Sequence, residues 1–125
     1  MIENELSKII IGTCIEIHRE LGPGLLESVY EEVLFSELRE KELHVQRQVS
    51  VPLLYKEMHF ETAYRLDLLV NNRVIIEIKA VENLAPVHYS QLLTYLKLSN
   101  KKLGLLINFN VKLLKEGIHR VVNKL

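Results

Sequence analysis

The spacing of apolar side chains changes along this chain, and this change limits the folds that it can adopt. In residues 5–42 the apolar positions recur every three or four residues, which predicts two helices broken by "GPG" at 22–24. From 45 to 80 the spacing shortens to that of strands, with turns near 56–57 and 71–72. The first two thirds of the chain therefore predict two helices followed by three antiparallel strands.

The last third predicts a crossover back to the same sheet. A helix is expected from Pro86 to about residue 100, because proline suits the first turn of a helix. The fully apolar run 103–109 then predicts a central strand, and 117–125 predicts a last one. The order ααβββαβ(β) indicates an α/β fold with a mixed central sheet flanked by helices.

Composition narrows the class of protein further. With 125 residues, 48% of them apolar, the chain is long enough for one domain over 1–125 and too short for two. It carries no apolar run that would span a bilayer and no secretory leader at its start, so we expect a cytoplasmic protein with no membrane partner. The single cysteine, Cys14, is expected to be a buried hydrophobic residue.

The strand 74–80 carries two charged side chains on one face. Glu77 and Lys79 are two residues apart, so both lie on the same side of the strand. Whether Asp67 joins them depends on the preceding turn. A three-residue loop at 71–73 pairs Asp67 with Glu77, whereas a two-residue turn at 71–72 pairs Asp67 with Ile76 and turns Glu77 to the opposite face. Both alternatives are open at the level of sequence.

Regular alternation makes a further prediction about the strand 59–70. It places Leu66, Leu68 and Val70 on one face and Asp67 on the other.

A convergence of Asp67, Glu77 and Lys79 would suit a hard divalent cation. Two neighbouring carboxylates repel unless a cation or a proton lies between them, and Mg²⁺ prefers oxygen ligands. Lys79 would orient or deprotonate a water molecule. The simpler alternative is a surface ion pair, which is common on paired strands.

Polar residues on the helices add to this hypothesis. His88, Gln91 and Tyr95 form a stripe beside the apolar face of the helix 86–100, and Glu27 opens the second helix. The alternatives are a solvated stripe and an acid that complements the helix dipole.

Charge is unevenly distributed although the net charge is zero. Residues 97–125 hold seven bases and one acid, so we expect a basic surface that contacts phosphates. Its candidate residues are Lys97, Lys101, Lys102 and Arg120. The alternative is a set of ordinary solvated side chains.

Taken together, these residues resemble the PD-(D/E)XK nuclease superfamily. The resemblance is carried by Asp67, by Glu77-Ile78-Lys79 on the next strand, and by Gln91 and Tyr95 on the next helix. The stretch "GLLESVY" at 24–30 matches the signature of one group within it, the GxxExxY proteins. The resemblance covers about residues 5–123 and implies a restriction-endonuclease-like core.

The resemblance also implies a role for each residue. Asp67, Glu77 and the backbone carbonyl of Ile78 would bind Mg²⁺ or Mn²⁺, with Glu27 as an additional ligand. Lys79 would activate the attacking water. Gln91 would contact the site, while Tyr30, His88 and Tyr95 would support it. Leu66 stands where the family has proline, and one cysteine cannot supply the four-cysteine iron–sulfur cluster of some relatives.

Three functions remain open from the sequence. The first is a metal-dependent nuclease that acts on nucleic acid, with DNA as the expected substrate. The second is a nucleic-acid-associated module that is inactive without a partner. The third is a non-catalytic interaction protein in which Glu77 and Lys79 form a structural ion pair. Pairing with a second copy or with a partner protein is likewise left open.

Overall fold

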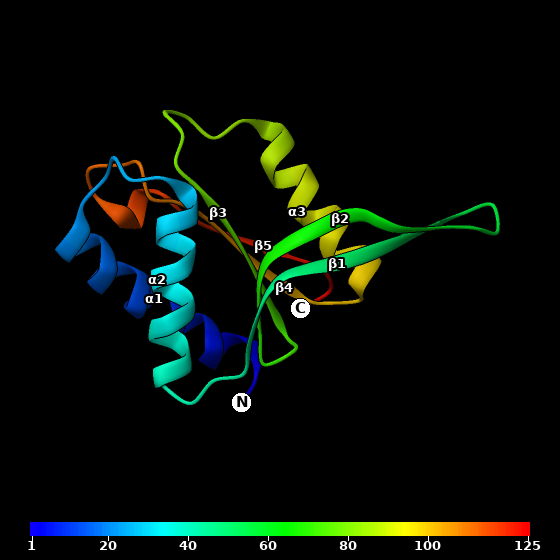
Figure 1. Ribbon diagram of the computed structural model, residues 1–125, viewed down its shortest axis with the longest axis horizontal. Coiled ribbons are helices and arrows are strands. Elements are labelled where there is room, and N and C mark those ends of the chain that lie inside the picture. Colours follow the sequence, from blue (N-terminus) through cyan, green and yellow to red (C-terminus); the bar gives the residue numbers. More distant parts are fainter.

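The order of helices and strands predicted from the sequence is confirmed. The computed structural model describes all 125 residues except the side chains of residues 62 and 63. Its elements, shown in Figure 1, are α1 (Glu3–Leu21), α2 (Glu27–Glu40), β1 (Val45–Tyr55), β2 (Met58–Val70), β3 (Val74–Lys79), α3 (Pro86–Ser99), β4 (Leu103–Asn108), a short 3₁₀ helix (Leu114–Glu116) and β5 (Ile118–Val122). The last strand, β5, is thus present as expected.

The sheet is mixed, as the element order predicts. Its five strands lie in the order β1-β2-β3-β4-β5, and of the four neighbouring pairs only β3 and β4 are parallel. Helix α3 makes the crossover that a parallel pair requires. All residues of β4 are buried, which agrees with the apolar run that precedes Asn108.

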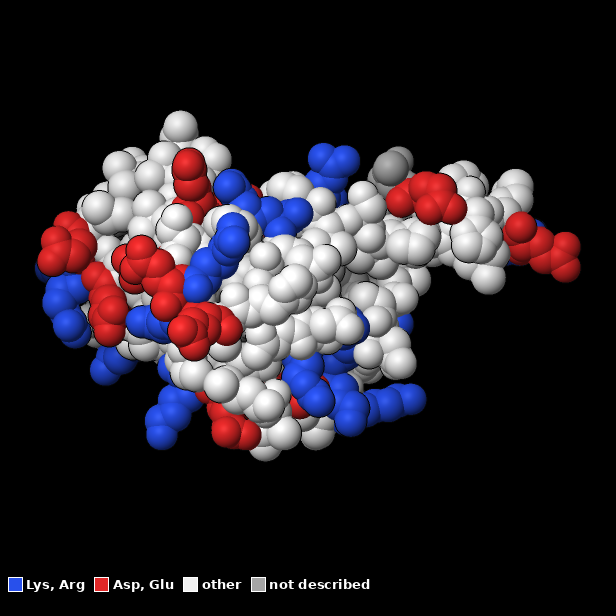
Figure 2. Space-filling model, turned by 60° about the horizontal axis from the view of Figure 1, so that its bottom comes forward, with Lys and Arg blue, Asp and Glu red and all other residues white. Residues whose placement is uncertain are grey.

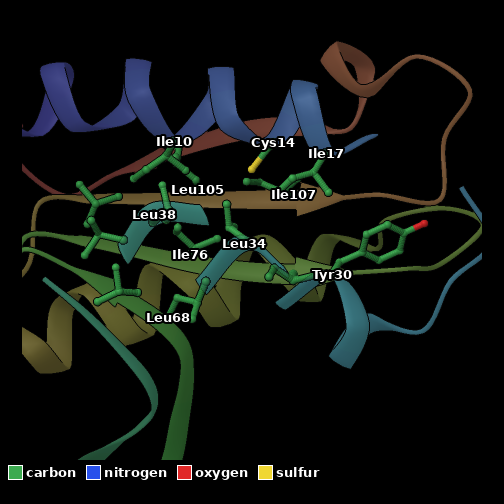
Figure 3. Close-up of a cluster of buried hydrophobic side chains, with 14 of the residues drawn as sticks. Ile10, Cys14, Ile17, Tyr30, Leu34, Leu38, Leu68, Ile76, Leu105 and Ile107 are labelled. Atoms are coloured by element: carbon green, nitrogen blue, oxygen red, sulfur yellow. The ribbon is translucent and has the colours of Figure 1, made fainter. Parts of the chain in front are cut away.

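Helices cover both faces of the sheet. On one face α1 and α2 enclose the larger core, and Figure 3 shows Ile10 and Cys14 of α1 pointing towards Leu105 and Ile107 of β4. On the other face α3 packs through Leu92 and Leu96. Cys14 is fully buried, as expected, and burial raises the pKa of its thiol.

The turn between β2 and β3 decides the register that the sequence left open. Asn71 and Asn72 both have positive φ, and the Arg73 N–H donates to the Val70 carbonyl. The sheet nevertheless pairs Val70 with Val74, so Arg73 is an extra residue in the loop. The connection is therefore the three-residue alternative.

Alternation along β2 is broken at Asp67, so the prediction of one common face is wrong. Leu68 and Val70 pack under α1 and α2, but Leu66 packs on the α3 side. Opposite Asp67, Gln48 has a φ of 50°, and the ladder from β1 to β2 records no pair at that position. The local twist at Gln48 explains why Leu66 changes sides.

Beyond this break the β1–β2 hairpin projects from the body of the molecule (Figure 1). Leu54, Tyr55, Met58 and Phe60 are exposed on it. Figure 2 shows this arm as mostly uncharged surface, whereas most basic side chains lie over the body.

Candidate active site

The carboxyl end of β3 brings Asp67 and Glu77 together. The ladder pairs Leu68 with Ile76, so its continuation places Asp67 opposite Glu77. Asp67 Oδ2 accepts a hydrogen bond of 2.8 Å from the Ile78 N–H. In a regular sheet, a backbone carbonyl of the neighbouring strand would accept a hydrogen bond from this N–H. The Asp67 carboxylate takes the place of that carbonyl, and the contact holds the carboxylate against β3.

Glu77 is a buried carboxyl without a complete set of partners. Only 6% of the residue is exposed, and its buried Oε1 has no hydrogen-bond partner among the described residues. Burial, and after it the charge of Asp67, raises the pKa of Glu77 to about 9, while Lys79 opposes the shift. In the metal-free protein Glu77 is therefore protonated at neutral pH.

An orphaned buried oxygen beside a second carboxylate fits a divalent cation. A cation would supply the missing partner and would remove the repulsion between Asp67 and Glu77. The described residues nevertheless contain no cluster of three acidic, histidine or cysteine side chains able to hold a metal. The geometry accordingly supports a two-carboxylate site.

Helix α3 places Tyr95 near this pair. Its ring lies against Tyr64, with centroids 5.3 Å apart, and burial followed by the charges of Glu77 and Asp67 raises the pKa of its hydroxyl. Gln91 lies one turn earlier and is exposed. His88 does something more local, because its Nδ1 accepts a hydrogen bond from the Ala85 N–H at the start of the helix.

The GxxExxY stretch builds the loop that leads into α2. Gly24 has a φ of 100°, a conformation that disfavours other residues. The Tyr30 hydroxyl donates to the Gly22 carbonyl and accepts from the Leu25 N–H, while its ring stacks on Phe109 at 4.4 Å. Tyr30 thus holds the loop that precedes Glu27.

The side chain of Glu27, the first residue of α2, lies next to the end of β3. It does not form a cluster with Asp67 and Glu77. Its Oε2 accepts a hydrogen bond of 3.2 Å from the Ala80 N–H, and the side chain is exposed. Glu27 therefore contacts the backbone three residues after Glu77.

A second acid on α2, Glu31, was missed by the sequence reasoning. Glu31 is buried and accepts hydrogen bonds from Arg47 Nε, from Arg47 Nη2 and, at 2.9 Å, from Gln48 Nε2. The same Gln48 nitrogen lies 3.5 Å from Asp67 Oδ1. Burial raises the pKa of Glu31 despite Arg47, and Asp67 adds to this effect. No local sequence pattern marks Gln48 as a bridge, because its role depends on its unusual backbone conformation.

Asn108 was also missed. It is buried at the end of β4, where its amide donates to the Val81 carbonyl and its Oδ1 accepts from the Val81 N–H. It therefore ties down the segment that follows β3. A polar residue at the end of an otherwise apolar strand was the available signal.

The expected basic residues lie away from this site. Val74 pairs with Leu103, so Lys101 and Lys102 are at the opposite end of β3 from Lys79. Lys101 Nζ donates to Asn72 Oδ1 in that region. Of the other two expected residues, Lys97 is in the last turn of α3, and Arg120 donates to Asn4 Oδ1.

A mixed sheet with this strand order, covered by helices on both faces, defines an α/β protein with a restriction-endonuclease-like fold. The chain belongs to the PD-(D/E)XK nuclease superfamily, whose family model matches residues 4–121. Members are typically nucleases that use Mg²⁺ or Mn²⁺. No curated protein and no solved structure matches the chain significantly. Among its described helices, none has the length and apolar character needed to cross a membrane.

Proposed function

We propose that this protein is a Mg²⁺- or Mn²⁺-dependent nuclease that hydrolyses phosphodiester bonds of DNA. The observation that carries the proposal is the buried Glu77 carboxyl, which faces Asp67 and whose Oε1 has no hydrogen-bond partner in the described part of the chain. A fold does not require such a group, and an unpaired buried polar atom destabilises it. The proposal treats residues 1–125 as one catalytic domain in the GxxExxY group and expects it in the cytoplasm.

Asp67, Glu77 and the Ile78 carbonyl would hold the metal ion. When bound, the ion would stabilise charge on the phosphate and acidify a water molecule. Glu27, which now bonds the Ala80 N–H, is the proposed additional ligand from α2.

The remaining residues would orient the reactants. Lys79 shares the face of β3 with Glu77, so its ammonium would hold the attacking water in line and exchange a proton with it. Tyr95 and Gln91 would position the scissile phosphate from α3, while Tyr30 and His88 would keep the loop and the helix start in place.

A non-catalytic role for the charged pair is less well supported. Glu77 and Lys79 do not form an ion pair with each other in the described part of the chain. The structural ion pair that this alternative requires is therefore absent from the described part of the chain.

One observation favours the second candidate, a module that needs a partner for activity. In the described residues Glu27 does not join Asp67 and Glu77 in a cluster of three. A partner or a nucleic acid that moves the start of α2 would then complete the ligand set.

The proposal is tested by DNA cleavage with matched variants. Wild type, Asp67→Asn, Glu77→Gln and Lys79→Ala would be purified identically and incubated with plasmid and single-stranded DNA in Mg²⁺, Mn²⁺ or chelator. Glu82→Gln is the control, because Glu82 is an exposed carboxylate in the segment after β3. Cleavage by wild type and the control alone supports the proposal. Equal cleavage by all five proteins would refute it, and cleavage by none would favour the partner-dependent module.

A further inference from the structure

A basic hollow lies between the end of α1 and the segment that follows β4. It has a volume of about 430 Å³, and its charged lining comes from Arg19, Lys112 and Lys115, beside His18. Its described lining residues include no carboxylate. Lys112 and Lys115 are among the seven bases of residues 97–125, but neither they nor Arg19 and His18 were named as candidate site residues from the sequence.

The two lysines have no neutralising partner within the part of the chain that the structure describes. Lys112 and Lys115 are exposed, and neither takes part in an ion pair or side-chain hydrogen bond among the described residues. Arg19 also borders a second hollow that is lined by three glutamates, so its charge is partly compensated. Lys112 and Lys115 line the basic hollow but not this second one.

The hollow is joined to the candidate active site by the backbone. The Phe109 N–H donates a hydrogen bond of 2.9 Å to the Lys79 carbonyl. Two residues later, the Val111 carbonyl lies 2.8 Å from His18 Nε2, at the wall of the hollow. Lys112 is thus three residues from Phe109, about 11 Å of fully extended chain at most. Lys112 therefore follows β4 at the end of the sheet where Lys79 lies.

The loop between the helices also connects the two regions. Gly22 and Pro23 line the hollow, and the same loop leads to Glu27, which bonds the Ala80 N–H. The loop therefore carries both a wall of the hollow and the acid that contacts the segment after β3.

We propose that the basic hollow binds phosphate groups of the nucleic-acid strand that is cut at Asp67 and Glu77. The inference rests on the proposed nuclease function and adds the surface that holds its substrate. Lysines that contact phosphates add affinity and position the strand without reading its sequence. The same contacts would serve DNA and RNA, because both offer phosphodiester oxygens.

Binding without cleavage tests this inference separately from activity. Fluorescence anisotropy in EDTA would follow labelled 20-nucleotide DNA, the matching duplex and a 20-nucleotide RNA between 20 and 200 mM KCl. The test variant is Lys112→Ala/Lys115→Ala. The matched control is Lys101→Ala/Lys102→Ala, which removes two lysines from the opposite end of the sheet. Circular dichroism and thermal melting would show that both variants fold.

The test variant is expected to bind at least tenfold more weakly at low salt, and the control less than twofold more weakly. Losing two phosphate contacts should lower the salt slope by about 1.4 on single strands and about 1.8 on the duplex. RNA and single-stranded DNA should change alike.

Equal losses in the two variants, an unchanged test variant, or a wild type that binds no nucleic acid would each overturn the inference. If the wild type binds with the expected pattern but never cleaves in metal, the proposed function fails while the binding site stands.

Discussion

Replacing Glu77 by glutamine should stabilise the metal-free protein while it abolishes activity. Glu77 is 6% exposed and faces Asp67, and these surroundings raise its pKa from 4.5 to about 9. The folded protein must therefore take up a proton at neutral pH, which costs free energy. Glutamine carries no such cost, and its amide, like a protonated carboxyl, has a donor to offer Asp67.

The magnitude follows from the two pKa values. Between pH 4.5 and about 9, the unfolded chain has lost the Glu77 proton and the folded protein keeps it. The unfolding free energy should therefore fall by about 1.4 kcal/mol for each pH unit gained. The stability that protonated Glu77 contributes is fully present below pH 4.5 and is lost by about pH 9. At pH 7 the loss amounts to about 3 kcal/mol.

Urea unfolding in EDTA at pH 6, 7 and 8 measures this difference. Subtracting wild type from Glu77→Gln removes the titration of every other group that both proteins share. The variant should be more stable by about 3 kcal/mol at pH 7, and its advantage should grow with pH. Glu82→Gln, which keeps Glu77, should retain the wild-type slope. A difference that does not depend on pH, or a variant less stable than wild type, would refute the reasoning.

Other expected outcomes concern metal binding and two side chains, Tyr30 and Asn108, that hold loop segments by hydrogen bonds. Mn²⁺ binding at pH 7 should release about one proton, because Glu77 must ionise to bind the metal. The heat of Mn²⁺ binding, measured by calorimetry, should therefore vary with the ionisation enthalpy of the buffer. A heat that is the same in all buffers would contradict this prediction. Tyr30→Phe loses the hydrogen bond to the Gly22 carbonyl, and urea unfolding should show a cost of about 1–2 kcal/mol. Asn108→Ala leaves the Val81 N–H and carbonyl without their partner, and the same measurement should show a loss of about 2 kcal/mol. A loss of less than about 0.5 kcal/mol of unfolding free energy in either variant would mean that water replaces the hydrogen bonds of the mutated side chain.

The elements could be read from the sequence because their signals are local. Apolar spacing and turn residues identified the helices, the strands and the turn at 56–57 without knowledge of distant residues. The turn at 71–72 shows the limit of such signals. Asparagine tolerates positive φ in either kind of loop, so only the pairing of Val70 with Val74 in the sheet decides the register.

The basic residues show a second limit. The sequence predicts one basic surface over 97–125, but Lys102 precedes β4 and Lys112 follows it. Six strand residues at about 3.3 Å each separate the two by roughly 20 Å. Because β4 runs parallel to β3, Lys79 pairs with Asn108 at the end of β4, whereas Lys101 and Lys102 precede the start of that strand.

The sequence alone determined the succession of elements, the α/β class and the placing of an acid and a base on one face of β3. Those features depend on residues that are close together in the chain. The tertiary structure decided that Asp67 faces Glu77, that Glu77 is buried, that Gln48 links Glu31 to Asp67, and that Lys112 lines a hollow with Arg19 of α1. These relations join segments far apart in sequence, so they depend on strand register and packing, which local periodicity does not encode.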